Sequence, residues 1–424
     1  MGGAVPETAV LPASDATPFP IGKRELMVML ALAQALQALA IDFMLPGLGA
    51  IAQDLGTADP NRRQLVVGLF LVGIGVGSLV PGALADRFGR RPVLLTCIAG
   101  YVAISFACAL VQDFTVLAAL RLLEGLICAG LAVIPLAIIR DRFDGDRMAS
   151  LQSTMAVIFL VVPMLAPSLG QIVLIIAGWR WIFGLMGVFG AGMGLWVWLR
   201  LPETLKSEYR QTLGLKTIGG NMYEVLITRA SIGYVLANCC TLAIIWGYVQ
   251  SSQQLVGEHF GAGTAFPLFF GGMALCMAGA SFTNSRIVER FGARRVAHAA
   301  LMIYLVVAAL QFWLAHSGHE TLWQFVPLMT LTMVCGGFTS ANFSSIALQP
   351  FARTAGAASS VQGFIRNCLA SLIAAGIGQA YDGSARPLSD AIVAAGIAAL
   401  GLVLWSERGR LFRRLHPPGA GRPA

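Results

Sequence analysis

Long apolar segments alternate with short polar connections along almost the whole chain. Six of them lie at about 25–49, 64–85, 93–111, 115–139, 150–174 and 180–200, and six more lie at about 230–255, 264–286, 295–316, 322–348, 355–380 and 386–406. An α-helix needs about 20 apolar residues to cross the hydrocarbon core of a bilayer. A soluble helical protein would interrupt such segments with polar faces. The pattern predicts an all-α membrane protein of twelve transmembrane helices.

Polar stretches divide these helices into two bundles of six. We expect a disordered cytoplasmic tail at 1–22, a first bundle at 23–200, a cytoplasmic linker at 201–228, a second bundle at 229–408 and a basic cytoplasmic tail at 409–424. The composition agrees, because only 12% of the residues are charged and 57% are hydrophobic. A soluble protein carries about 25% charged residues, so this chain has too few to cover a water-facing surface.

The basic residues predict the orientation. Of the 29 Lys and Arg residues, only Arg62, Arg63, Arg180 and Arg386 fall in one set of alternate connections, and Arg121 and Arg366 fall in apolar segments. The rest lie in the other connections and the tails, which marks these as cytoplasmic. Both termini are therefore expected inside the cell. The net charge of +8 then belongs to a face that meets anionic lipid, and we expect no nucleic-acid partner.

One sequence motif occurs twice. Asp86–Arg91 follows the second apolar segment and Glu289–Arg295 follows the eighth, so each is the second inside loop of its half. Two matching halves predict a duplicated bundle around a central cavity. We expect a cytoplasmic gate here, in which small residues let helices approach closely and charges reach a helix end of the other half. Its residues are Gly82, Asp86, Arg87, Gly89, Arg90, Arg91, Glu289 and Arg290. The alternative is a basic topology loop with a turn glycine.

Several motifs together resemble one known family. They are Ile41–Pro46, Gly82–Pro92, Arg121–Gly125, Pro163–Gly170, Gly178–Phe183, Pro202–Thr204 and Ala355–Ser360. The chain resembles the major facilitator superfamily and, within it, the bicyclomycin/chloramphenicol resistance (Bcr/CflA) drug:proton antiporters, over nearly its whole length. Two positions depart from the family pattern: Met44 stands where tyrosine is common, and Gln171 stands where a second glycine is common.

The resemblance implies a twelve-helix facilitator fold that works by alternating access. It implies that Asp42 takes part in proton coupling and in recognition of cationic substrates. It also implies that Arg121 handles protons, and it associates the motif ending in Gly170 with antiporters.

Four strongly ionisable side chains fall within apolar segments: Asp42, Arg121, Glu124 and Arg366. A charge at bilayer depth costs about 3 kcal/mol on insertion scales, so each must be paired, neutralised or exposed to water. A desolvated carboxyl group holds its proton near neutral pH, so Asp42 is expected to exchange a proton for cargo. The alternative is that Asp42 pairs statically with an arginine or caps a broken helix.

Two of these charges are three residues apart, so Arg121 and Glu124 share one helix face. They either neutralise each other or leave Arg121 to act on Asp42. Arg366 either lines the cavity and binds anionic groups or extends to the interface.

A greasy cavity wall is expected from aromatic and sulfur side chains, which alternatively face lipid or pack between helices. These are Trp246, Tyr248, Phe269, Phe270 and Met273. We also expect Pro46, Pro163 and Pro167 to kink or break helices near the midplane.

Other chemistry is missing from the sequence. It contains no phosphate-binding loop, dinucleotide fingerprint or metal-ligand cluster, and its five histidines lie near predicted loops or span ends, which argues against a buried histidine relay. We therefore expect a monomeric secondary transporter of the cell inner membrane, not an enzyme, without a cofactor other than protons as coupling ion. It would export small lipophilic drugs or toxic compounds. The alternatives are an exporter of an endogenous metabolite, a proton-symport importer and a transporter-like sensor.

Overall fold

The computed structural model describes residues 21–57, 59–143, 145–205, 215–351 and 355–412. Most of the two predicted tails, and residues 206–214 of the predicted linker, lie outside the described residues.

The first half of the chain folds into helices with short 3₁₀ segments between some of them. They are α1 (Lys23–Asp42), η1 (Leu45–Gly47), α2 (Leu48–Asp54), η2 (Pro60–Gln64), α3 (Leu65–Gly77), α4 (Val80–Phe88), α5 (Arg90–Leu110), α6 (Phe114–Arg142), α7 (Gly145–Ala177) and α8 (Trp179–Arg200).

The second half repeats this organisation after the linker helix α9. Its elements are α9 (Leu215–Ile227), α10 (Arg229–Ser252), the π-helical η4 (Gln253–His259), η5 (Gly263–Ala265), α11 (Phe266–Phe291), α12 (Ala293–Ser317), α13 (Leu322–Leu348), η6 (Gln349–Phe351), α14 (Ala355–Gln379) and α15 (Arg386–Ser406).

The all-α architecture predicted from the sequence is confirmed. In the described residues, 10 helices are long and apolar enough to cross a membrane, or 11 if the bent pair α3–α4 forms one span. The described apolar part of α7, Val161–Ala177, is a shorter helix.

Two of the predicted spans are interrupted. The first breaks after Asp42, and Pro46 lies in the 3₁₀ turn that separates α1 from α2. A proline cannot donate the backbone hydrogen bond that would continue the helix. Helices α3 and α4 bend by 48° at their junction, where Pro81 lies at the start of α4. Helix α7, in contrast, continues through Pro163 and Pro167, so neither proline breaks a helix.

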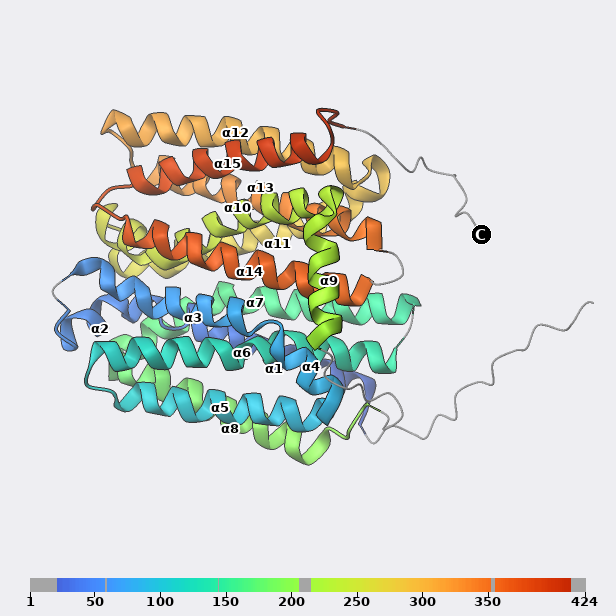
Figure 1. Cartoon of the computed structure of the whole chain (residues 1–424). Coiled ribbons are helices and arrows are strands. Elements are labelled where there is room, and N and C mark those ends of the chain that lie inside the picture. The colour runs from blue at the N-terminus through green and yellow to red at the C-terminus, as the bar shows by residue number, and fades with distance from the viewer. Residues whose placement is uncertain (1–20, 58, 144, 206–214, 352–354, 413–424) are drawn as a thin grey trace, which may run out of the picture.

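The helices of the two halves lie side by side in Figure 1, with α1–α8 below and α10–α15 above. Helix α9 runs nearly perpendicular to the others and crosses both halves near one end of the bundle. We call this end, which includes Gly89 and Gly292, the linker end. The opposite end, which includes η2, η4 and Gly318, is the distal end.

Glycines permit the closest helix contacts. An added Cβ at Gly73 or Gly125 would overlap the backbone of the facing helix in the α3–α6 pair. Helix α3 also meets the second half, because a Cβ at Gly75 would lie 2.8 Å from Cα of Cys368 in α14. Likewise, a Cβ at Gly271 of α11 would lie 2.7 Å from the carbonyl oxygen of Met164 in α7. Small residues let helix backbones approach where apolar burial alone gives no drive between helices in lipid.

The internal repeat is visible in the backbone. Gly89 (φ 106°) ends α4 and precedes α5, and Gly292 (φ 84°) ends α11 and precedes α12. Residues with a side chain avoid this region of φ. The equivalent loops of the two halves therefore turn in the same way, at the same end of the bundle.

Candidate functional site

Asp42 is the last residue of α1 and lies directly before the helix break. Its side chain is buried, with 6% exposure. Within the described part of the chain, no group forms a hydrogen bond or an ion pair with its carboxylate. Neither of the alternative roles expected for Asp42, a static arginine pair or a helix cap, occurs among these residues.

Gly170 of α7 packs directly against the chain beside Asp42. A Cβ at this position would overlap the carbonyl oxygen of Phe43. The glycine of the motif that resembles antiporters therefore lets α7 touch the broken end of α1. Both segments belong to motifs that are visible in the sequence, but nothing in the sequence indicates that they meet.

Arg121 of α6 is fully buried and makes contacts in several directions. Its Nη1 lies 2.5 Å from Oε2 of Glu124, its Nη2 donates to the carbonyl oxygen of Ala40 at 2.7 Å, and its Nε donates to that of Val66 at 3.0 Å. The guanidinium also lies over the ring of Phe70, 4.2 Å from its centroid. One arginine thereby ties α6 to α1 and α3.

Glu124 is also fully buried and satisfied. Its Oε1 accepts a hydrogen bond of 2.9 Å from Ser105 Oγ of α5, and its Oε2 pairs with Arg121. Of the two expected roles, the structure therefore shows mutual neutralisation. Arg121 reaches α1 through a backbone carbonyl two residues before Asp42, and not through the Asp42 carboxylate.

Arg366 of α14 is half-buried in the second half. Its Nη1 donates to Ser344 Oγ at 3.2 Å and its Nε to Asn367 Oδ1 at 3.1 Å. Asn238 of α10 donates to the same Ser344 hydroxyl at 2.9 Å, while its own Oδ1 is buried without a partner. No carboxylate of the described residues forms an ion pair with Arg366, so its charge is available to an anionic or carbonyl group.

The predicted cavity aromatics pack largely against one another. Tyr248 is fully buried, donates to Met273 Sδ at 3.0 Å and stacks with Phe270. Phe269 lies edge-on to Trp323, and Trp246 borders the apolar core. None of the five lines either of the two described cavities, so a role in a central cavity stays a prediction.

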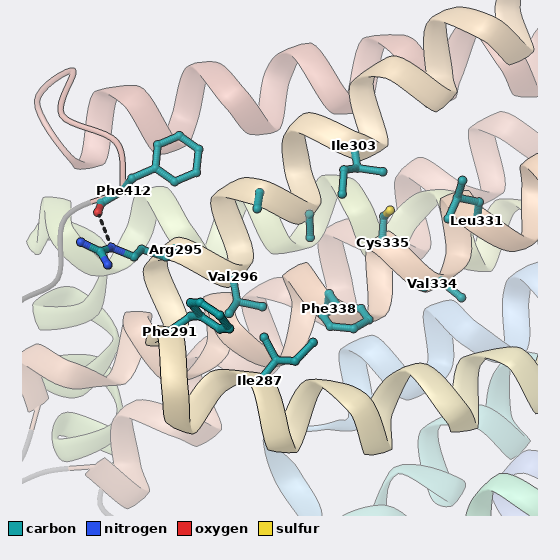
Figure 2. A pocket seen from close by; sticks show the side chains of 12 residues that line it. Ile287, Phe291, Arg295, Val296, Ile303, Leu331, Val334, Cys335, Phe338 and Phe412 are labelled. Atoms are coloured by element: carbon teal, nitrogen blue, oxygen red, sulfur yellow. Dashed lines mark hydrogen bonds between the residues drawn. The ribbon is translucent and has the colours of Figure 1, made fainter. Parts of the chain in front are cut away.

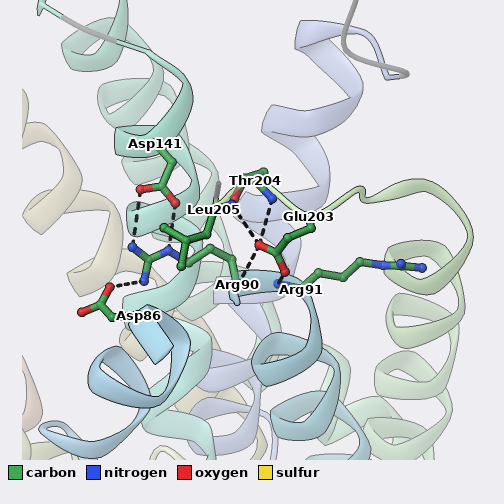
Figure 3. A network of polar contacts seen from close by, with 7 residues as sticks. All are labelled: Asp86, Arg90, Arg91, Asp141, Glu203, Thr204 and Leu205. Atoms are coloured by element: carbon green, nitrogen blue, oxygen red, sulfur yellow. Dashed lines mark hydrogen bonds and ion pairs between the residues drawn. The ribbon is translucent and has the colours of Figure 1, made fainter. Parts of the chain in front are cut away.

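The loop Asp86–Arg91 at the linker end forms a charge cluster (Figure 3). Arg90 pairs with Asp86 at 2.5 Å and with Asp141 of α6 at 2.8 Å. Glu203, which follows α8, accepts hydrogen bonds from the backbone N–H groups of Arg90 (2.9 Å) and Arg91 (3.2 Å). A Cβ at Gly89 would overlap the Glu203 carboxylate, which explains the glycine there.

Two features of this loop in this conformation differ from what the sequence led us to expect, and the gate between the halves stays a prediction. The described partners of Asp86 and the arginines lie in the same half, because Asp141 and Glu203 take the place expected of a helix end from the other half. A Cβ at Gly82 would meet Val133 at 3.5 Å, an ordinary contact, so close approach at that point does not require glycine. Arg87 lies over the ring of Phe88.

The equivalent loop of the second half has a related pairing. Arg294 pairs with Glu407, which follows α15, at 2.7 Å, just as the first loop binds Glu203 after α8. Glu289 and Arg290 are exposed. In each half, an acidic residue after the last helix therefore binds the start of the helix that follows the loop, which is α5 in the first half and α12 in the second.

A buried histidine lies in this second network. His298 is fully buried, and its Nε2 lies 3.0 Å from the hydroxyl of Tyr234, which also donates to Glu407. Its Nδ1 accepts from the N–H of Phe412 at 3.0 Å. The position near a helix end was predicted correctly, but the C-terminal segment covers it.

The polar contacts between described residues of the two halves lie at the distal end. Arg63 of η2 forms a two-point ion pair with Glu258 of η4, at 2.7 and 2.5 Å. Asn61 donates to the carbonyl oxygen of Tyr381 at 2.6 Å and accepts from Gln379 at 3.0 Å. The sequence gave no expectation of a contact between these residues.

A buried pair of amides lies beside this ion pair, because Gln64 donates to Gln254 across the two halves. Two features of the sequence could have indicated a polar contact here: glutamines inside otherwise apolar segments, and a rare arginine in a connection at the distal end. What the sequence lacked was any indication that the two segments face each other.

The model of the family described as Major Facilitator Superfamily matches residues 30–375. The chain belongs to the Major Facilitator Superfamily. The resemblance seen in the sequence is thereby confirmed, and the chain is a multi-pass membrane transporter and not an enzyme.

The relatives agree with this assignment. Multidrug resistance protein MdtL of Klebsiella pneumoniae (strain 342) is 31% identical over 337 residues, which cover 78% of this chain and 83% of the relative. A bicyclomycin resistance protein homolog of Haemophilus influenzae is 26% identical over 343 residues, covering 80% and 85%. The partially occluded, inward-open structure of the xylose transporter XylE from E. coli superposes with a TM-score of 0.68 at 11% identity, covering 95% of this chain and 99% of that one. This last likeness shows the fold.

Within this superfamily fold, the site is divided between the halves. Asp42 and the Arg121–Glu124 pair lie in the first half, and Arg366 lies in the second. Helices α3 and α14 meet near Cys368, two residues from Arg366. The contact thus brings the second-half arginine close to the boundary between the halves.

Proposed function

We propose that this protein is a proton-coupled exporter of small lipophilic compounds, with twelve transmembrane helices that work by alternating access. Nearly all basic connections lie at the linker end, so we place this end in the cytoplasm. The membrane in this proposal is the cell inner membrane. Two relatives carry names that refer to drug resistance, which supports drug-like molecules as cargo.

The structure fits one state of the transport cycle. At the distal end, Arg63–Glu258 and the neighbouring amide contacts join the halves. At the linker end, the described charges of the Asp86–Arg90 cluster pair within their own half. This arrangement corresponds to a state closed toward the outside, in which cargo enters from the cytoplasm.

The observation that carries the proton coupling is the state of Asp42. A buried carboxylate without a bonding partner is costly as an anion, so either a proton or a cationic cargo must relieve it. The neighbouring Arg121 cannot do so in this state, because its nitrogens are engaged elsewhere. Competition between proton and cargo for one carboxylate is what an antiporter requires.

The two halves offer different chemistry to a cargo. Asp42 attracts a cationic or hydrogen-bond-donating group, whereas Arg366 attracts an anionic or carbonyl group. The aromatic and sulfur side chains near Tyr248 add an apolar surface. A lipophilic molecule with a basic amine, or a zwitterionic one, matches this set.

The decisive experiment uses purified protein in liposomes with an imposed pH gradient and a panel of drug-like substrates. The parent protein should accumulate substrate when the lumen is acidic, and Asp42→Asn should lose this accumulation, because asparagine carries neither the exchangeable proton nor the negative charge that holds a cationic cargo. Asp113→Asn is the matched control, because Asp113 is an exposed N-cap residue of α6 and asparagine caps helices equally well.

Undiminished gradient-driven accumulation by Asp42→Asn would refute the proton-coupling proposal. Accumulation only when the gradient is reversed would instead identify a symporter.

A further inference from the structure

An apolar groove runs along the membrane-facing side of the second half, between α11, α12 and α13 (Figure 2). Its volume is about 530 Å³. Phe291, Ile303 and Leu331 line it and are 46%, 51% and 40% exposed. Such side chains on a membrane helix face the lipid. Neither Asp42 nor Arg366 lines the groove, so it is separate from the candidate transport site.

A single charged residue, Arg295, lines the groove at its linker end. The Arg295 Nε donates to the carbonyl oxygen of Phe412 at 3.2 Å, as Figure 2 shows. Its two terminal nitrogens form no hydrogen bond or ion pair with a described residue, and the residue is exposed. The groove thus presents a free guanidinium edge next to an apolar slot.

The length of the groove corresponds to one leaflet. Along α12 it extends from Arg295 to Ile303, eight residues, which is a rise of about 12 Å in an α-helix. The hydrocarbon core of a bilayer is about 30 Å thick, so one leaflet contributes about half of that. A ligand with its charge at Arg295 would lie in the leaflet at the linker end.

We propose that this groove binds an anionic phospholipid, with the phosphate at Arg295 and an acyl chain between α11, α12 and α13. Basic pockets between transmembrane helices are attractive to anionic head groups on the cytoplasmic side, and a guanidinium can bind two oxygens of one phosphate. The site is independent of the transport chemistry proposed above, although both place the linker end in the cytoplasm.

The segment after α15 forms part of this site. Phe412 has a left-handed backbone (φ 60°), which is uncommon for a residue with a side chain. Two hydrogen bonds hold it there, from its N–H to His298 Nδ1 and from Arg295 to its carbonyl oxygen, and its ring lines the groove. A head group bound to Arg295 would therefore also contact the C-terminal segment.

The test compares lipids on the purified full-length chain in neutral detergent. The probes are phosphatidylglycerol, phosphatidylcholine with the same acyl chains, and glycerol phosphate as a head group without chains. The readout is the midpoint of thermal unfolding, which a ligand of the folded state raises, with native mass spectrometry to count bound lipids. We expect phosphatidylglycerol to raise the midpoint clearly more than phosphatidylcholine, and glycerol phosphate to have little effect.

Three variants locate the binding. Arg295→Gln should reduce the phosphatidylglycerol effect to that of phosphatidylcholine, and Ala299→Trp, which fills the groove, should reduce both effects. Arg24→Gln, which removes an exposed arginine at the linker end of the first half, should behave like the parent protein.

Equal stabilisation by the two lipids in the parent protein would overturn the proposal. A retained preference for phosphatidylglycerol in Arg295→Gln would also overturn it. This second criterion holds even if the groove-filling variant Ala299→Trp does not fold. An equal effect of glycerol phosphate would indicate a phosphate site without an acyl chain, and this too would overturn a lipid site.

Discussion

Arg63 of η2 and Glu258 of η4 form a two-point ion pair that joins the two halves of the transporter at its distal end. The pair rests on Gly49 of α2, where a Cβ would lie 3.4 Å from Arg63 Nη1 and 3.6 Å from Glu258 Oε1. In the alternating-access cycle proposed above, the halves separate here, so we expect the pair to break in each cycle.

We expect Arg63→Ala and Glu258→Gln to shift the protein toward the outward-open state. The ion pair is hydrogen-bonded, but the Glu258 side chain is 46% exposed, so we assign it about 1 kcal/mol, or a fivefold change in the equilibrium. Spin labels at Thr57 and Thr264, in a Cys276→Ser background, report the distance between the halves. The charge-swapped double variant should restore the short distance, and unchanged distance distributions in both single variants would contradict the gate.

The Arg121–Glu124 pair should be essential for folding, and not only for transport. Glu124→Gln leaves the fully buried arginine without its counter-charge, and such a loss costs about 3–5 kcal/mol. We expect a large fall in the yield of monodisperse protein and in the unfolding temperature, irrespective of any pH gradient. Arg24→Gln serves as the control for loss of an exposed charge. A Glu124→Gln protein that is as stable as its parent would show that the pair is dispensable.

The effect of Gly→Ala substitutions on stability should depend on how closely the glycine packs against a neighbouring helix. Gly125→Ala forces a Cβ into the carbonyl oxygen of Phe70, and Gly170→Ala does the same at Phe43, so each should destabilise the protein by about 1–3 kcal/mol or more. Gly184 and Gly192 of α8 have open space around the added atom, so alanine there should be neutral or stabilising by up to about 1 kcal/mol. Thermal unfolding in detergent measures the difference. Equal effects at the four positions would mean that the close approaches are not rigid.

Glu320, in the connection between α12 and α13, should make stability depend on pH. Partial burial raises the pKa of this carboxyl to about 7, and both of its oxygens lack a hydrogen-bond partner. The unfolded chain releases this proton near pH 4.5 and the folded chain only near pH 7, so the contribution of Glu320 to stability falls as pH rises through this window and is constant above it.

The variant Glu320→Gln should therefore be more stable than its parent above pH 7, by on the order of 1 kcal/mol after allowance for solvent. Near pH 4 the two proteins should unfold alike. Unfolding midpoints measured from pH 4 to pH 8 test this, and parallel curves for the two proteins would rule out Glu320 as the cause.

The sequence by itself determined the features that depend on local composition. Apolar segments of membrane-crossing length gave the all-α architecture, because a backbone in lipid must satisfy its own hydrogen bonds within each helix. The repeated loops around Gly89 and Gly292 gave the duplication, and Pro46 gave the break after Asp42. The short spacing of Arg121 and Glu124 limited their relationship to two alternatives.

Only the tertiary structure decided which segments meet. The partners of Arg90 are Asp141 and Glu203, and the halves join through Arg63 and Glu258, all distant in sequence. Charges of either sign occur in many connections, so composition cannot assign pairs or choose which end of the molecule is closed. Helix packing sets these distances, through close approaches such as Gly170 on Phe43, and thereby leaves the Asp42 carboxylate buried without a partner.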